Sequence, residues 1–157
     1  MRSLFRLLVI AALMSMPPIS ASFAGNAKAT KNIAKIHRVV IQVDQNDPAV
    51  MNLALNNATN IFEYYLKKDE PVEINIVTYG PGLHMLRDTS PVRDRIKQLK
   101  DLAFPGKIEF SACNNTKQAM EKREGQSIAI LPEARLVPSG VVTLTELQEK
   151  GWSYVRP

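Results

Sequence analysis

The sequence is poor in the residues that build cysteine- and histidine-based sites. Its 157 residues include one cysteine, Cys113, and two histidines, His37 and His84. One cysteine excludes an internal disulfide framework and a cluster of cysteine metal ligands. Two histidines leave little material for a histidine-rich metal centre. We therefore assign neither a metal nor a cofactor to the chain. The thiol of Cys113 is the one candidate for cysteine-based chemistry.

Apolar runs long enough to cross a membrane are also missing from the start of the chain. The apolar stretch at residues 7–16 is about ten residues long, whereas a spanning helix needs roughly 20. Two arginines precede it, and Ser22 and Ala24 provide the small residues of a cleavage site. This pattern predicts a secretory signal peptide at 1–24 and a flexible leader at 25–35. We expect a periplasmic or secreted protein without a stable membrane span.

The charge pattern does not indicate a nucleic-acid partner. The whole chain has 20 Lys+Arg against 15 Asp+Glu, a net charge of +5. Without the predicted signal peptide the net charge falls to +3, with basic and acidic residues interspersed and no aromatic-basic patch. The hydrophobic fraction of 45% and the charged fraction of 22% are those of an ordinary globular protein. We expect one domain, residues 36–157.

Strand and helix patterns alternate along that domain. Strand-like runs occur at 39–43, 72–79, 107–112, 128–131, 134–137 and 152–155. Asp47 before Pro48 predicts the start of a long amphipathic helix. Asn115 is a candidate cap for a helix ending near Gly125, and residues 143–146 match a capping box. The alternation predicts an α/β domain with a mostly parallel sheet and helices on both faces.

Ligands of such sheets bind beyond the carboxyl ends of the strands. Cys113 lies where a predicted strand gives way to a helix, so helix amides would favour its thiolate. A buried cysteine that serves only as a small apolar side chain fits the same position. Tyr79, Asn114 and His84 are candidate substrate-binding residues near the same edge, and His84 is a candidate base or hydrogen-bond donor.

Other chemistries lack their motifs. The loop at residues 80–82 has neither the third glycine nor the lysine of a phosphate-binding loop. The chain has no Gly-x-Ser-x-Gly elbow and no histidine pair at metal-ligand spacing.

Four segments carry a resemblance to a known family: residues 39–43, 76–80, 108–116 and 137–157. Together they resemble the DsrE/DsrF-like family, small α/β proteins of sulfur relay, and the last segment is similar to a poorly characterised, exported branch. The resemblance implies a three-layer fold, a persulfide carried on Cys113, and a thiol or persulfide partner protein. It also implies assembly of the chain into trimers or hexamers.

Three functions are compatible with these observations. The first is an exported sulfur carrier, or a sulfurtransferase-like protein, that uses Cys113 as its persulfide site. The second is a noncatalytic module that binds a small ligand or assembles with other copies, with Cys113 as packing. The third is a redox sensor in which Cys113 pairs between subunits.

Overall fold

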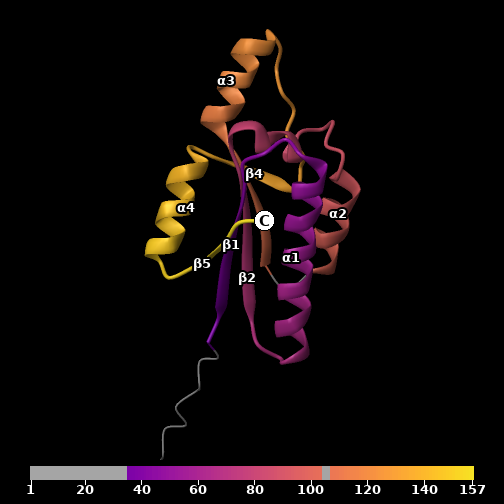
Figure 1. Cartoon of the computed structure of the whole chain (residues 1–157), viewed down its shortest axis with the longest axis vertical. Coiled ribbons are helices and arrows are strands. Elements are labelled where there is room, and N and C mark those ends of the chain that lie inside the picture. Colours follow the sequence, from indigo (N-terminus) through magenta and orange to yellow (C-terminus); the bar gives the residue numbers. More distant parts are fainter. Residues whose placement is uncertain (1–34, 104–106) are drawn as a thin grey trace, which may run out of the picture. The chain divides into compact units, whose positions relative to one another are not determined.

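The computed structural model describes residues 35–103 and 107–157 (Figure 1). The predicted signal peptide and nearly all of the predicted leader lie outside the described residues.

The centre of the fold is a parallel β-sheet. Its strands are β1 (His37–Val43), β2 (Val72–Thr78), β3 (Lys107–Cys113), β4 (Ala134–Val137) and β5 (Ser153–Val155). They lie in the order β4-β3-β2-β1-β5, and every neighbouring pair is parallel. The central strands are rich in buried β-branched residues, which pack well on a pleated surface covered on both sides. The predicted parallel sheet is confirmed.

Helices cover both faces of this sheet. They are α1 (Pro48–Lys67), α2 (Arg93–Leu102), α3 (Asn114–Glu124) and α4 (Gly140–Glu149), together with a short 3₁₀ helix, η1 (Gly80–Leu86). In Figure 1, α1 and α2 lie on one side of the sheet and α4 on the other. The core beneath α1 and α2 is large, whereas α4 seals a small one around Val40, Val77 and Leu144. The predicted three-layer α/β fold is confirmed.

The start of α1 follows from its local sequence. The Asp47 carboxylate accepts a hydrogen bond from the Ala49 amide at 2.8 Å, and Pro48 occupies the first turn. The buried stripe of α1 consists of Met51, Ala54, Leu55, Ala58 and Phe62. Each large apolar side chain in such a stripe contributes about 1.5–3 kcal/mol when fully buried. The cap was predicted correctly, and the amphipathic helix is confirmed, although Leu66, expected on the apolar stripe, is 61% exposed.

Two local predictions were wrong. Residues 128–131 form no strand; Ile130 makes only an isolated antiparallel bridge with Arg87. Thr143 does not cap a helix, because α4 begins earlier, at Gly140, and the Thr143 hydroxyl donates to the Ser139 carbonyl inside the first turn. The start of α4 is set by its packing against the strand ends rather than by a local capping sequence.

Cys113 lies at the carboxyl end of the sheet, next to the end of β4. It is the last residue of β3 and pairs with Val137, the last residue of β4. The chain leaves β3 into α3, whose Met120 joins the core beneath α1 and α2. It leaves β4 into α4, whose Leu144 joins the core of the opposite face. Ligands of parallel sheets bind beyond the carboxyl ends of the strands, so Cys113 lies at a candidate ligand-binding edge.

Candidate functional site

Cys113 ends β3 and also caps α3. Its Sγ accepts a hydrogen bond from the backbone amide of Thr116, with a donor–acceptor distance of 3.4 Å. The prediction that Asn115 caps this helix was therefore wrong, because α3 begins one residue earlier, at Asn114. A thiol in the cap position points at the unpaired amides of the first helical turn.

The first residue of α4 approaches the same thiol. A Cβ atom added to Gly140 would lie 2.8 Å from the Cβ of Tyr79 and 3.3 Å from the Cβ of Cys113. Only glycine allows α4 to begin this close to both strand ends. The Gly140 amide thereby comes close enough to Sγ to favour the thiolate. The structure thus brings Tyr79 and Cys113, two of the predicted site residues, to the same helix end.

The hydrogen bonds to Sγ outweigh the effect of burial. Cys113 is only 3% exposed, and burial by itself raises the pKa of its thiol. The Thr116 amide donates to Sγ, and the neighbouring Thr116 hydroxyl and the amides of Gly140 and Asn115 also favour the charged sulfur, so together they hold that pKa below its ordinary value. Two helix N-termini therefore favour the thiolate of one buried cysteine.

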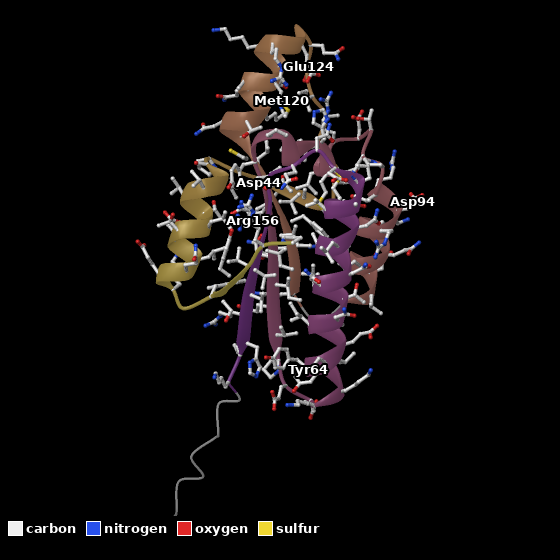
Figure 2. The ribbon with its side chains drawn as sticks, viewed as in Figure 1. Asp44, Tyr64, Asp94, Met120, Glu124 and Arg156 are labelled. Carbon is white, nitrogen blue, oxygen red and sulfur yellow. The ribbon has the colours of Figure 1, made fainter. Side chains whose placement is uncertain are left out.

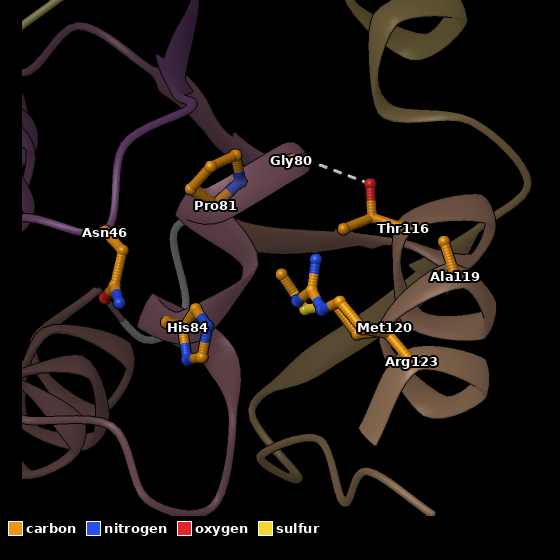
Figure 3. Close-up of a pocket in the computed structure, with 8 residues that line it drawn as sticks. All are labelled: Asn46, Gly80, Pro81, His84, Thr116, Ala119, Met120 and Arg123. Atoms are coloured by element: carbon orange, nitrogen blue, oxygen red, sulfur yellow. Dashed lines mark hydrogen bonds between the residues drawn. The ribbon is translucent and has the colours of Figure 1, made fainter. Parts of the chain in front are cut away.

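Thr116 links the thiol to the neighbouring 3₁₀ helix. The backbone amide of Gly80 donates to the Thr116 hydroxyl oxygen at 2.9 Å, as drawn in Figure 3. Because the oxygen accepts this bond, the hydroxyl proton remains available for the Cys113 sulfur. Thr116 is thus fixed as a donor by its own partner.

A polar network lies beside Tyr79 at the end of β1. Tyr154 donates its hydroxyl to Gln42 at 2.6 Å, and Gln42 donates its amide to Asp44 at 2.9 Å. Arg156 reaches the same carboxylate at 3.1 Å (Figure 2). Burial and then the negative charge of Asp44 raise the pKa of Tyr79. Tyr79 is consequently a neutral phenol near pH 7, and the Cβ side of its side chain packs against Gly140.

A cavity of about 280 Å³ lies on the other side of Thr116, between η1 and α3 (Figure 3). It is lined by Asn46, Gly80, Pro81, His84, Thr116, Ala119, Met120 and Arg123. His84 therefore faces this cavity, which does not include Cys113. Burial and then the charge of Arg87 lower the pKa of His84, so its ring is neutral near pH 7. Gly82 allows η1 to pack here, because a Cβ at that position would lie 2.1 Å from the Val43 carbonyl oxygen.

The remaining predicted residues divide between the two ends of the sheet. Asn114 is half-buried at the first position of α3, next to Cys113. His37 lies at the opposite end, as expected, where its ring stacks on Tyr65 at 3.8 Å and contacts Glu70 at 2.9 Å.

Sequence reasoning assigned no role to Thr116 or Gly140. The signal for Thr116 is its place three residues after Cys113, where a first-turn amide faces the cap. The signal for Gly140 is a glycine after a predicted strand, at the same edge of the sheet as Cys113.

Neither a metal centre nor a membrane span is found in residues 35–103 and 107–157. No three His, Cys, Asp or Glu side chains gather there in a way that would hold a metal ion. None of the helices in these residues is both long and apolar enough to cross a membrane.

Comparison with known proteins identifies the family. The model of the DsrE/DsrF-like family matches residues 35–157, nearly the whole described chain. The chain belongs to the DsrE/DsrF-like family. Membership of the DsrE/DsrF-like family suggests a role related to sulfur relay.

Among solved structures, this DsrE/DsrF-like protein is similar to a protein of unknown function, MTH1491 from Methanobacterium thermoautotrophicum. The two are 31% identical, with a TM-score of 0.63, and the match covers 77% of this chain and 99% of MTH1491. No curated protein is significantly similar to the chain.

Proposed function

We propose that this protein carries sulfur as a persulfide on Cys113 and passes it to an acceptor thiol outside the cytoplasm. The observation that carries the proposal is the position of Sγ between the first turns of α3 and α4, where the Thr116 amide donates to it and Gly140 approaches it closely. A thiolate is the nucleophilic form of cysteine, and these groups favour it. Export is supported by the signal-like pattern of residues 1–24.

The reaction is a transfer of sulfur between thiolates. The Cys113 thiolate attacks the outer sulfur of a donor persulfide, R–S–SH. A bond forms between Sγ and that sulfur, while the S–S bond of the donor breaks and its electron pair leaves on R–S⁻. The proton of the persulfide stays on the transferred sulfur, and R–S⁻ takes up a proton from water. An acceptor thiolate then repeats the step on the Cys113 persulfide.

Tyr79 and Asn114 are proposed as substrate-binding residues for this step. The Cβ of Tyr79 packs against the same helix end as Cys113, and its neutral hydroxyl is the kind of donor that suits an anionic sulfur chain. Asn114 is the residue after Cys113 and offers an amide group at the opening of α3. His84 faces the adjoining cavity, so its proposed role is binding the body of the donor rather than proton transfer at Sγ.

Alkylation of native protein tests the proposal. Because Cys113 is the single cysteine of the sequence, a thiol reagent reports on this site alone. We expect a reaction midpoint below that of the urea-unfolded chain, and a gain of one sulfur atom in intact mass after exposure to polysulfide. The Cys113→Ser variant must gain none. A thiol that reacts only in urea would overturn the proposal.

The burial of Cys113 favours a second candidate, a noncatalytic module that binds a small ligand. At 3% exposure and with Sγ serving as a helix cap, Cys113 also has the environment of a structural residue. In that case Cys113→Ser, whose hydroxyl is a good helix cap, folds and functions like the parent protein. Complementation of a deletion strain by this variant separates the two candidates.

Self-assembly is part of the proposal. The apolar side chains of Leu136, Val141 and Val142 are each about half exposed on β4 and the first turn of α4. Three exposed apolar side chains within seven residues of sequence are a candidate interface. We expect a trimer or hexamer by light scattering, and a monomer at all concentrations would contradict this part. The appearance of crosslinked dimers after mild oxidation would indicate instead the redox-sensor function.

A further inference from the structure

The cavity between η1 and α3 has the composition of a site for a small amphipathic molecule. Pro81, Ala119 and Met120 form its apolar surface. Its polar side chains are few, as is usual in ligand sites: the Asn46 amide, the His84 ring, the Thr116 hydroxyl and the Arg123 guanidinium. In Figure 3 the side chains of Met120 and Arg123 extend from α3 toward His84 of η1.

The charges around this cavity leave one positive group for a ligand. Both carboxylate oxygens of Glu124 accept hydrogen bonds from Arg87, at 3.0 and 2.9 Å. Arg123 is 3.8 Å from the same carboxylate, beyond hydrogen-bonding distance, and its side chain is 68% exposed. Arg87 therefore balances Glu124, and Arg123 supplies a net charge of one at the mouth of the cavity. His84 adds one neutral N–H donor or acceptor.

The size and the charge together select the ligand class. A volume of about 280 Å³ corresponds to about nine water molecules of liquid, enough for an anion of about ten non-hydrogen atoms. A guanidinium matches the two oxygens of a carboxylate. The net charge of +1 that remains after Arg87 pairs with Glu124 matches a single negative charge on the ligand.

We infer that the cavity lined by His84, Ala119 and Arg123 binds a small monocarboxylate with a short apolar body. The carboxylate contacts Arg123 and the apolar body lies against Ala119, Met120 and Pro81. The site is separated from Sγ by Thr116, which lines the cavity and donates to the thiol. The inference goes beyond sulfur transfer and does not depend on it; it would supply the ligand class for the noncatalytic candidate.

The probe for this site is isovalerate, with isovaleramide as its neutral isostere and inorganic phosphate as a multivalent anion. Titration of the ¹⁵N-labelled protein should give saturable shifts of the Gly80, Thr116 and Ala119 amides with isovalerate. Replacing the carboxylate by the amide should weaken binding about tenfold, because a charge-assisted pair of hydrogen bonds is lost. Phosphate should bind more weakly than isovalerate.

Matched variants assign the binding to the cavity. Arg123→Gln should weaken isovalerate about tenfold, whereas Lys122→Gln, the same charge change at an exposed neighbour outside the cavity, should have less than about a twofold effect. Ala119→Leu should block both isovalerate and isovaleramide, while Gln118→Leu should not.

Equal binding of isovalerate and isovaleramide, equal loss in Arg123→Gln and Lys122→Gln, or the absence of saturable shifts would overturn the inference. Cys113→Ser should bind isovalerate like the parent protein. A failure of sulfur transfer therefore leaves this result unchanged, and the two proposals are tested separately.

Discussion

Replacing Gly140 by alanine tests whether the start of α4 shapes the thiol site. The new Cβ would lie 2.8 Å from the Tyr79 Cβ, an atom fixed to its backbone, and 3.3 Å from the Cys113 Cβ. Overpacking of this kind costs about 1–3 kcal/mol. The higher helix propensity of alanine returns up to about 1 kcal/mol. We expect a net loss of about 1–2 kcal/mol in the free energy of unfolding, a fall in Tm of about 3–8 °C.

The same substitution should also change the thiol. The clash is relieved by moving the first turn of α4 away from Tyr79 and Cys113, which takes the Gly140 amide away from Sγ and weakens its stabilisation of the thiolate. The pKa of Cys113 should therefore rise, seen as an upward shift in the alkylation midpoint. Val141→Ala is the control, because this side chain is 56% exposed in the same turn and should change stability by less than about 0.5 kcal/mol. A Gly140→Ala protein with unchanged Tm and alkylation midpoint would refute the reasoning.

Three further predictions concern the groups around the thiol. Thr116→Val should raise the pKa of Cys113, because the hydroxyl that favours the thiolate is lost, and should lower the free energy of unfolding by about 1–3 kcal/mol, because the Gly80 amide loses its acceptor. Thr116→Ser keeps the hydroxyl and should preserve both the pKa and the stability. Alkylation measures the pKa, and urea unfolding measures the stability. The lowered pKa of Cys113 predicts that the folded state binds its proton less tightly than the unfolded chain does, so stability relative to Cys113→Ser should rise with pH from the folded pKa up to about 8.5 and level off above it. A flat difference across that window in urea unfolding would contradict this. Asp44→Asn should lower the pKa of Tyr79, because a nearby negative charge is removed, and should lower the free energy of unfolding by no more than about 1 kcal/mol. NMR titration of labelled tyrosine measures the pKa, and thermal unfolding measures the stability. A raised Tyr79 pKa would contradict the effect assigned to the Asp44 charge.

Local sequence signals predicted the elements whose boundaries depend on neighbouring residues. The start of α1 was predicted because Asp47, Pro48 and the apolar stripe lie within one segment. The position of Cys113 at the end of a strand, close to a helix start, was predicted for the same reason. The candidate edge of the sheet follows from these positions and from the geometry of parallel strands.

Contacts between distant segments explain what the sequence did not reveal. Residues 143–146 match a capping box, yet α4 begins at Gly140, because that glycine fits against side chains far away in sequence, Tyr79 and Cys113. β5 pairs with β1, at the opposite edge of the sheet from β4, because the chain crosses the sheet between β4 and β5. Local sequence patterns do not predict such a crossing. His84 was expected near the thiol, but Thr116 separates its cavity from Sγ.

The thiolate of Cys113 is stabilised by the same helix turns that bury it, so its acidity and its accessibility are separate properties. The amides of Thr116 and Gly140 favour the charged sulfur only while α3 and α4 stay closed around it. A donor that reaches Sγ must displace one of these turns and thereby weakens the stabilisation of the nucleophile. The alkylation midpoint measures the closed state, whereas the limiting rate at high pH measures how often the turns open. A low midpoint combined with a fast limiting rate is the signature of a sulfur carrier, and a low midpoint combined with a slow rate is that of a cysteine retained to cap α3.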